Sequence, residues 1–166
     1  MKKIVSMLDG LSRWTGKAVS YLMILVVAIV CFEVTMRYLF RRPTVWASEA
    51  IVICCAFIYV LGAAWTLQDD RHVRIDLLWE KLSPRGKRIM DSITFLFFAF
   101  YMGMMLWVGS RFAWESLQLR ETSGTPWDPP VYPVKIAFVA GILLLIGQGV
   151  SRLIRDLYFV TKGKEL

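Results

Sequence analysis

Histidine and cysteine are scarce in this sequence, and their scarcity excludes several kinds of site. Among 166 residues there is one histidine, His72, and there are three cysteines. A haem held by two histidines is therefore impossible, and the cysteines have no metal-ligand spacing with His72. Because Cys31, Cys54 and Cys55 all fall inside long apolar stretches, we interpret them as small packing residues.

Recognisable catalytic motifs are also missing. No Ser-His-Asp or Cys-His set can be assembled at one depth, and no glycine-rich phosphate loop occurs. The first apolar run is too long for the core of a signal peptide and has no small-residue cleavage pattern after it. We therefore expect a retained first span, no enzyme activity, no catalytic or metal-ligating residues and no cofactor in this chain.

Long hydrophobic runs are what the sequence does have, since 57% of its residues are hydrophobic and its mean hydropathy is +0.52. A bilayer core of about 30 Å needs about 20 apolar helical residues to cross it. Four runs meet this requirement, at residues 18–39, 46–67, 89–114 and 134–158. The sequence therefore predicts an all-α integral membrane protein whose single transmembrane domain, residues 1–166, has four transmembrane helices.

The placement of the basic residues gives the expected orientation. The net charge is +7, but the cations flank apolar spans and form no stripe with aromatic residues, so nucleic acid is an improbable partner. Lys and Arg concentrate before the first span, between the second and third, and after the fourth. By the positive-inside rule both termini are cytoplasmic.

The segments between the spans have their own patterns. Residues 1–17 are amphipathic, which predicts a short helix in the membrane interface before the chain turns into the bilayer, with a frayed basic tail as the alternative. The periodicity from His72 to Leu82 predicts an interfacial helix between spans two and three. Thr44, after Pro43, is the expected N-cap of the second span, and residues 122–133 are an expected loop.

Small residues mark faces where helices can approach each other closely. On the third span they form a stripe, namely Ser92, Ala99, Gly103 and Ser110. The fourth span offers a similar surface at Gly141, Gly147 and Gly149. The rest of the third span is rich in aromatic residues and methionine, and this surface faces either lipid or another membrane subunit.

Ionisable side chains inside a membrane are functional candidates, because burying them is costly. Glu33 and Arg37 lie four residues apart on the first span, and Arg111 and Glu115 repeat this spacing on the third, which predicts two ion pairs. Glu49 begins the second span. All five lie toward the outer ends of their spans, so structural pairing or partner contact is favoured over a transport role.

Several of these residues resemble one family, the small membrane subunit of tripartite ATP-independent periplasmic (TRAP) transporters. The resemblance runs from the end of the first span to the connection after the second, and its motif residues are Arg37, Pro43, Trp46, Glu49, Gly62, His72 and Asp76. The segment from Trp127 to Lys135 is also similar to some members. Ser48 and Asp70 depart from the pattern, since many members have an acidic residue and a glycine at these positions.

The resemblance implies one part of a three-part importer of organic acids in the cytoplasmic (inner) membrane of a bacterium or archaeon. In such a system a periplasmic binding protein captures the substrate, a large elevator-type membrane subunit moves it with sodium, and the small subunit is a scaffold for the large one. The expected partners are therefore the large subunit, the binding protein and the lipid bilayer. Six residues of the outer connections are candidate contacts with the binding protein, namely Arg41, Arg42, Arg120, Glu121, Trp127 and Asp128.

Two other functions remain open at this point. One is a self-sufficient, proton-coupled four-helix exporter that uses Glu33 as its essential carboxylate, although the strong Lys/Arg bias and the length of the chain count against it. The other is a membrane anchor for a redox enzyme, which lacks haem ligands here. The sequence does not disclose the substrate, the stoichiometry or the helix face that contacts a large subunit.

Overall fold

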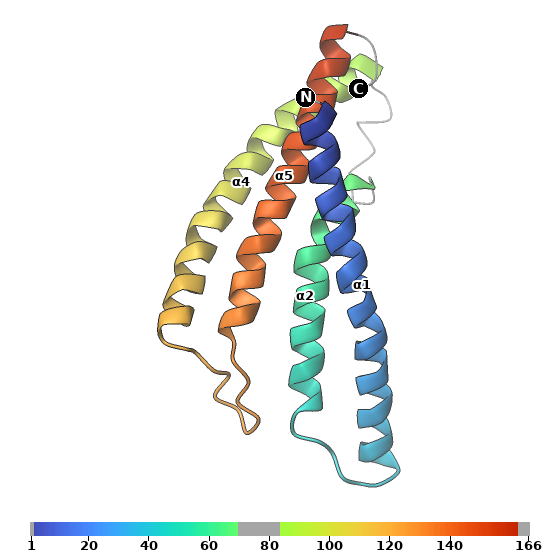
Figure 1. Ribbon diagram of the computed structural model, residues 1–166, viewed down its shortest axis with the longest axis vertical. Helices are drawn as coiled ribbons and strands as arrows, with labels where there is room; N and C mark the ends of the chain where they lie inside the picture. Colours follow the sequence, from blue (N-terminus) through green and yellow to red (C-terminus); the bar gives the residue numbers. More distant parts are fainter. Residues whose placement is uncertain (1, 70–83, 163–166) are drawn as a thin grey trace.

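The computed structural model describes residues 2–69 and 84–162, which form long helices joined by short connections (Figure 1). The helices of this part of the chain are α1 (Lys2–Tyr38), α2 (Ala47–Gln68), α4 (Pro84–Gln118) and α5 (Tyr132–Lys162). Each is long and apolar enough to cross a membrane. The predicted fold class, all-α with four membrane-spanning helices, is confirmed.

The four helices lie side by side in the order α4, α5, α2 and α1 (Figure 1). α1 packs against α2, α4 against α5, and α2 against α5, while α1 also touches α5. The start of α1 and the end of α5 lie at the same end of the molecule, where the helices converge, and the helices spread apart toward the other end. The molecule is thus two helical hairpins joined mainly through α2 and α5.

α1 is one continuous helix, so the separate amphipathic helix predicted for residues 1–17, with a turn after it, is wrong. Five buried positions recur at intervals of seven residues along the helix, namely Val5, Ser12, Val19, Val26 and Glu33, and Gly16 is buried against Trp65 of α2. A seven-residue repeat keeps one face of a helix in contact with its neighbours. This packing face extends past residue 17, and Lys2–Tyr38 contains no proline that would interrupt it.

Glycines allow the helices to approach each other closely, as predicted for α5. A Cβ atom built on Gly141 would lie 2.6 Å from the carbonyl oxygen of Val60 in α2. Gly149 has a similar contact with the ring of Phe98 in α4, and Gly147 lies near Leu8 in α1. α5 therefore uses three glycines to contact three helices.

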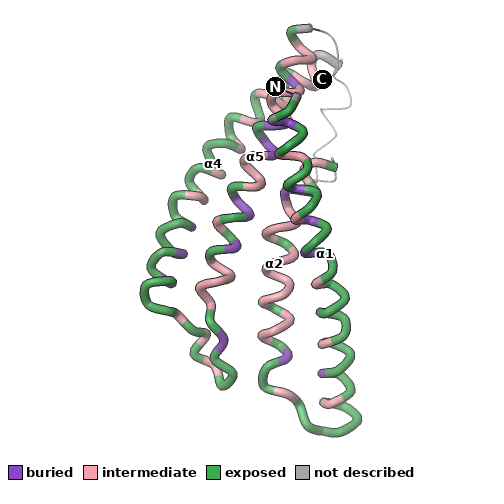
Figure 2. The backbone as a smooth tube through the Cα atoms, viewed as in Figure 1, coloured by how far each residue is buried: buried purple, intermediate pink, exposed green. Residues whose placement is uncertain are grey.

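The predicted small-residue stripe of α4 is not the surface that packs on α5. Ala99, Gly103 and Ser110 are exposed, and nothing lies within 4 Å of a Cβ atom built on Gly103. The contact with α5 uses Phe98 and Gly109 instead, and much of α4 remains exposed (Figure 2). Close approach of another helix to the stripe stays a prediction.

Three helices extend beyond α2 at the end where they converge. Val60 lies beside Gly141 and eight residues before the end of α2 at Gln68, so α2 ends at about the level of Gly149. From this level α5 continues to Lys162, a further distance of about 20 Å at 1.5 Å per residue. The first turns of α1 and α4 accompany it. The predicted interfacial helix from His72 to Leu82 lies outside the described residues. α2 itself ends at Gln68, and Asp69 is its C-cap residue.

Substitution of Gly141 tests the contact between the two hairpins. Gly141→Ala should destabilise the purified subunit by about 1–3 kcal/mol, because the added methyl group meets backbone that cannot rotate away. Gly103→Ala is the matched control on α4, where the methyl group meets open space and stability should stay the same or rise. Thermal unfolding in detergent measures both, and equal stability of the two variants would contradict the close contact.

Candidate functional site

Glu33 holds the connection between α1 and α2 against α1. We call this end of the molecule, which the sequence predicts to face outward, the outer end. Its Oε1 atom accepts hydrogen bonds from Arg37 at 2.6 Å (Nη2) and 3.1 Å (Nε), which confirms the predicted ion pair. Its Oε2 atom accepts hydrogen bonds from Thr44, at 3.1 Å from the backbone N–H and 2.5 Å from the hydroxyl. Both carboxylate oxygens are therefore engaged, and the side chain is 9% exposed.

Thr44 is consequently not the N-cap of α2, contrary to the prediction. The N-cap position is occupied by Trp46, which makes no side-chain capping hydrogen bond. The connection folds back on α1 and so brings the hydroxyl of Thr44 within hydrogen-bonding distance of the buried carboxylate of Glu33. A charged acceptor forms a stronger hydrogen bond than a neutral one.

The two outer connections, residues 39–46 and 119–131, meet near the start of α2. The indole rings of Trp46 and Trp127 lie 6.4 Å apart, and the ring of Phe32 stacks on Trp46 at 6.0 Å. The hydroxyl of Ser123 donates a hydrogen bond of 3.2 Å to Glu49. These residues belong to separate segments of the sequence, and the fold brings them together in one outer surface.

The six predicted contact residues have different roles in this surface. Glu121 pairs with Lys135 at 2.5 Å, and the lysine lowers the pKa of the Glu121 carboxyl. The Oδ1 atom of Asp128 accepts a hydrogen bond of 2.9 Å from the N–H of Gly124. Trp127 contacts Trp46, as described above. The remaining three are exposed and have no side-chain partner within the described ranges, namely Arg41, Arg42 and Arg120.

A polar cluster at the opposite end joins α1, α4 and α5, and no prediction from the sequence included it. Asp9 of α1 pairs with Arg155 of α5 and accepts a hydrogen bond of 3.1 Å from Ser151. Between α4 and α5, Arg88 pairs with Asp156 at 2.5 Å, and Arg152 pairs with Asp91 at 3.6 Å. Acidic and basic residues in the ends of α1, α4 and α5 that extend beyond α2 were the available signal, but which of them pair depends on how the helices are rotated against one another.

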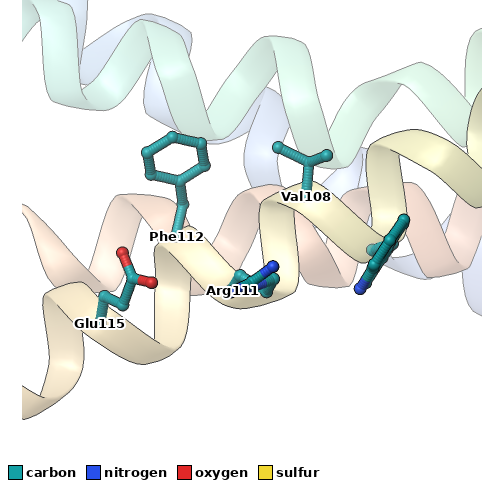
Figure 3. A pocket seen from close by; sticks show the side chains of 5 residues that line it. Val108, Arg111, Phe112 and Glu115 are labelled. Atoms are coloured by element: carbon teal, nitrogen blue, oxygen red, sulfur yellow. The ribbon is translucent and has the colours of Figure 1, made fainter.

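Arg111 and Glu115 do not form the predicted ion pair. They lie one turn apart on α4, where a hollow of about 240 Å³ is lined by these two residues together with Trp107, Val108 and Phe112 (Figure 3). Both side chains are exposed. Neither has a hydrogen-bond or ion-pair partner in the part of the chain that the structure describes.

The motif residues of the sequence gather mostly at the outer end. Arg37, Trp46 and Glu49 take part in the contacts described above, and Pro43 lies in the connection between them. Gly62 lies in the second half of α2, where an added Cβ atom would be 4.0 Å from Val19. His72 and Asp76 lie outside the described residues.

Comparison with known proteins identifies the family of this chain. The family model of the DctQ component of tripartite ATP-independent periplasmic transporters matches residues 10–158. The chain belongs to this family. It is also similar to a Haemophilus influenzae protein provisionally named a TRAP transporter small permease, with 24% identity over 164 residues, which cover 95% of this chain and 99% of that relative.

Membership of the DctQ family makes the chain a transporter subunit and not an enzyme. Together with its four candidate spans, it identifies a multi-pass protein of the inner membrane. The resemblance inferred from the motif residues is confirmed.

The polar cluster gives a prediction about stability. Asp156 is 2% exposed, so Arg88→Met should cost about 1–3 kcal/mol, because it removes a charged partner from a buried carboxylate. Lys135→Met is the matched control, since its partner Glu121 is 42% exposed and such a pair contributes about 0–1 kcal/mol. Chemical unfolding in detergent compares the two variants. A larger loss for Lys135→Met would contradict the assigned importance of the cluster.

Proposed function

We propose that this chain is the small permease subunit of a sodium-driven TRAP transporter that imports an organic acid, and that it acts as a static scaffold for the large elevator-type subunit. Family membership supports the transporter assignment. The scaffold role rests on one structural observation, which is that the polar contacts between elements are concentrated toward the two ends of the helices.

The polar cluster of Asp9, Arg88, Asp91, Arg152, Ser151, Arg155 and Asp156 ties three helices together at one end. Glu33 and the joined connections tie the helices at the other end. Between these two ends the helices pack through apolar residues and glycines. Such an arrangement suits a frame that keeps its shape while a neighbouring subunit moves, with the sodium sites in that neighbour.

The geometry of Glu33 disfavours the alternative of a self-sufficient exporter. A carboxylate that carries protons must exchange its partners during transport. Here both oxygens of Glu33 are engaged, one with Arg37 and the other with Thr44, close to the outer end of α1. We therefore assign Glu33 to the folding of the outer connection.

Reconstitution tests the scaffold proposal. Liposomes with this chain alone should show no uptake of organic acid, whereas addition of the large subunit and the binding protein should give uptake that depends on a sodium gradient. The chain should also co-purify with the large subunit. Uptake by this chain alone, or failure to co-purify, would overturn the proposal.

The free arginines of the outer surface support a second part of the proposal, docking of the periplasmic binding protein. Charge reversal by Arg41→Glu and Arg42→Glu should lower uptake about tenfold at low salt and less at high salt, because exposed charges act mainly on the association rate. Recovery of the membrane complex should not change. The control is Arg13→Glu, an exposed cation near the other end of α1. Equal uptake by both variants would remove the two arginines from the docking surface.

A further inference from the structure

The outward side of α4 has a second regular stripe, which faces away from α5. Its members are three or four residues apart and therefore share one side of the helix, namely Phe97, Phe100, Met104, Trp107, Arg111 and Glu115. We call them the outward stripe. Its four apolar members are between 53% and 76% exposed. Phe98 and Gly109, which contact α5, lie on the opposite side of α4.

The two charged members of this stripe lie farther from the outer end of the molecule than the first residue of α2. Val60 is thirteen residues from the first residue of α2 and lies beside Gly141, and Gly109 packs against Phe138, three residues nearer the outer end. At 1.5 Å per residue, Arg111 lies about 12 Å inward from the first residue of α2, and Glu115 about 6 Å. Arg111 therefore reaches the hydrocarbon region if α2 enters the bilayer where its helix starts.

Comparison with α1, the helix at the other edge, shows what is unusual about α4. The exposed surface of α1 has large apolar residues such as Ile24, Val27 and Val34. From residue 18 to residue 36 its single acidic or basic residue is Glu33, which is buried and paired. α1 thus presents lipid with an apolar surface, whereas α4 presents an arginine and a glutamate without partners in the described chain. Unpaired charges facing lipid are costly.

We propose that the outward stripe of α4 is the surface that binds the large membrane subunit, through a transmembrane helix with a carboxylate opposite Arg111 and a cation opposite Glu115. The inference rests on the proposed function, since it takes the large subunit as the neighbour. Alternation of three and four residues is the spacing at which side chains of two helices interlock. The opposite charges at one end of the stripe fix the register of the partner helix.

Site-specific cross-linking in native membranes tests this surface. A photoreactive amino acid is placed at Phe97, Phe100 or Trp107 in the chain co-expressed with the large subunit, and at Ile24, Val27 or Val34 as matched exposed positions on α1. The α4 positions should give a covalent product of the two subunits with several-fold higher yield than the α1 positions. Products from the α1 positions alone, or adducts of the α4 positions with lipid only, would overturn the inference.

The charged end of the stripe has its own measurement. Arg111→Glu should lower recovery of the complex about tenfold, because it places a like charge against the carboxylate of the partner. Arg13→Glu, which lies outside the stripe, should leave recovery unchanged, and thermal unfolding of the isolated subunit should be the same for both variants. Unchanged recovery with Arg111→Glu would overturn the charge assignment.

The outcomes separate this inference from the function on which it rests. If the unaltered chain fails to co-purify with the large subunit, both the scaffold proposal and the inference fail. If the unaltered chain co-purifies and cross-links only through α1, the scaffold proposal stands and the assignment to α4 alone is wrong.

Discussion

The close approach of α2 and α5 at Val60 and Gly141 is the contact on which the rest of the fold depends. It joins the hairpin of α1 and α2 to the hairpin of α4 and α5, with a smaller contribution from α1 and α5. Lipid tails are as apolar as the helix surfaces, so membrane helices associate through close packing and polar contacts and not through burial of apolar surface from water. A glycine that lets two backbones meet is therefore more important here than a larger side chain would be.

The positions of the polar groups follow from the same physics. An ion pair is costly in hydrocarbon and inexpensive near water, so the pairs of Arg155 with Asp9 and of Arg88 with Asp156 lie where three helices extend beyond α2. At the other end Glu33 is buried but has Arg37 and Thr44 as partners. Because polar contacts join the helices at both ends, the middle of the helices can stay apolar. An apolar middle suits a supporting subunit better than a pathway for a solute.

The two predicted pairs of acidic and basic residues show how far sequence spacing can be taken. Glu33 and Arg37 pair because the carboxylate is buried and its second oxygen is held by Thr44. Arg111 and Glu115 have the same spacing, but both are exposed and no third group orients them. Spacing shows that two side chains can meet, whereas burial and neighbouring groups decide whether they do.

The sequence by itself determined the helical class and the four long spans, because each residue's transfer from water to hydrocarbon depends mainly on its own side chain. The family also followed from sequence, through motif residues in a fixed order. The tertiary structure decided which sides of the helices meet: Gly109 and not Gly103 faces α5, and α1 continues through residue 17. These outcomes depend on the rotation of each helix against its neighbours, which all contacts settle together and which no local pattern contains.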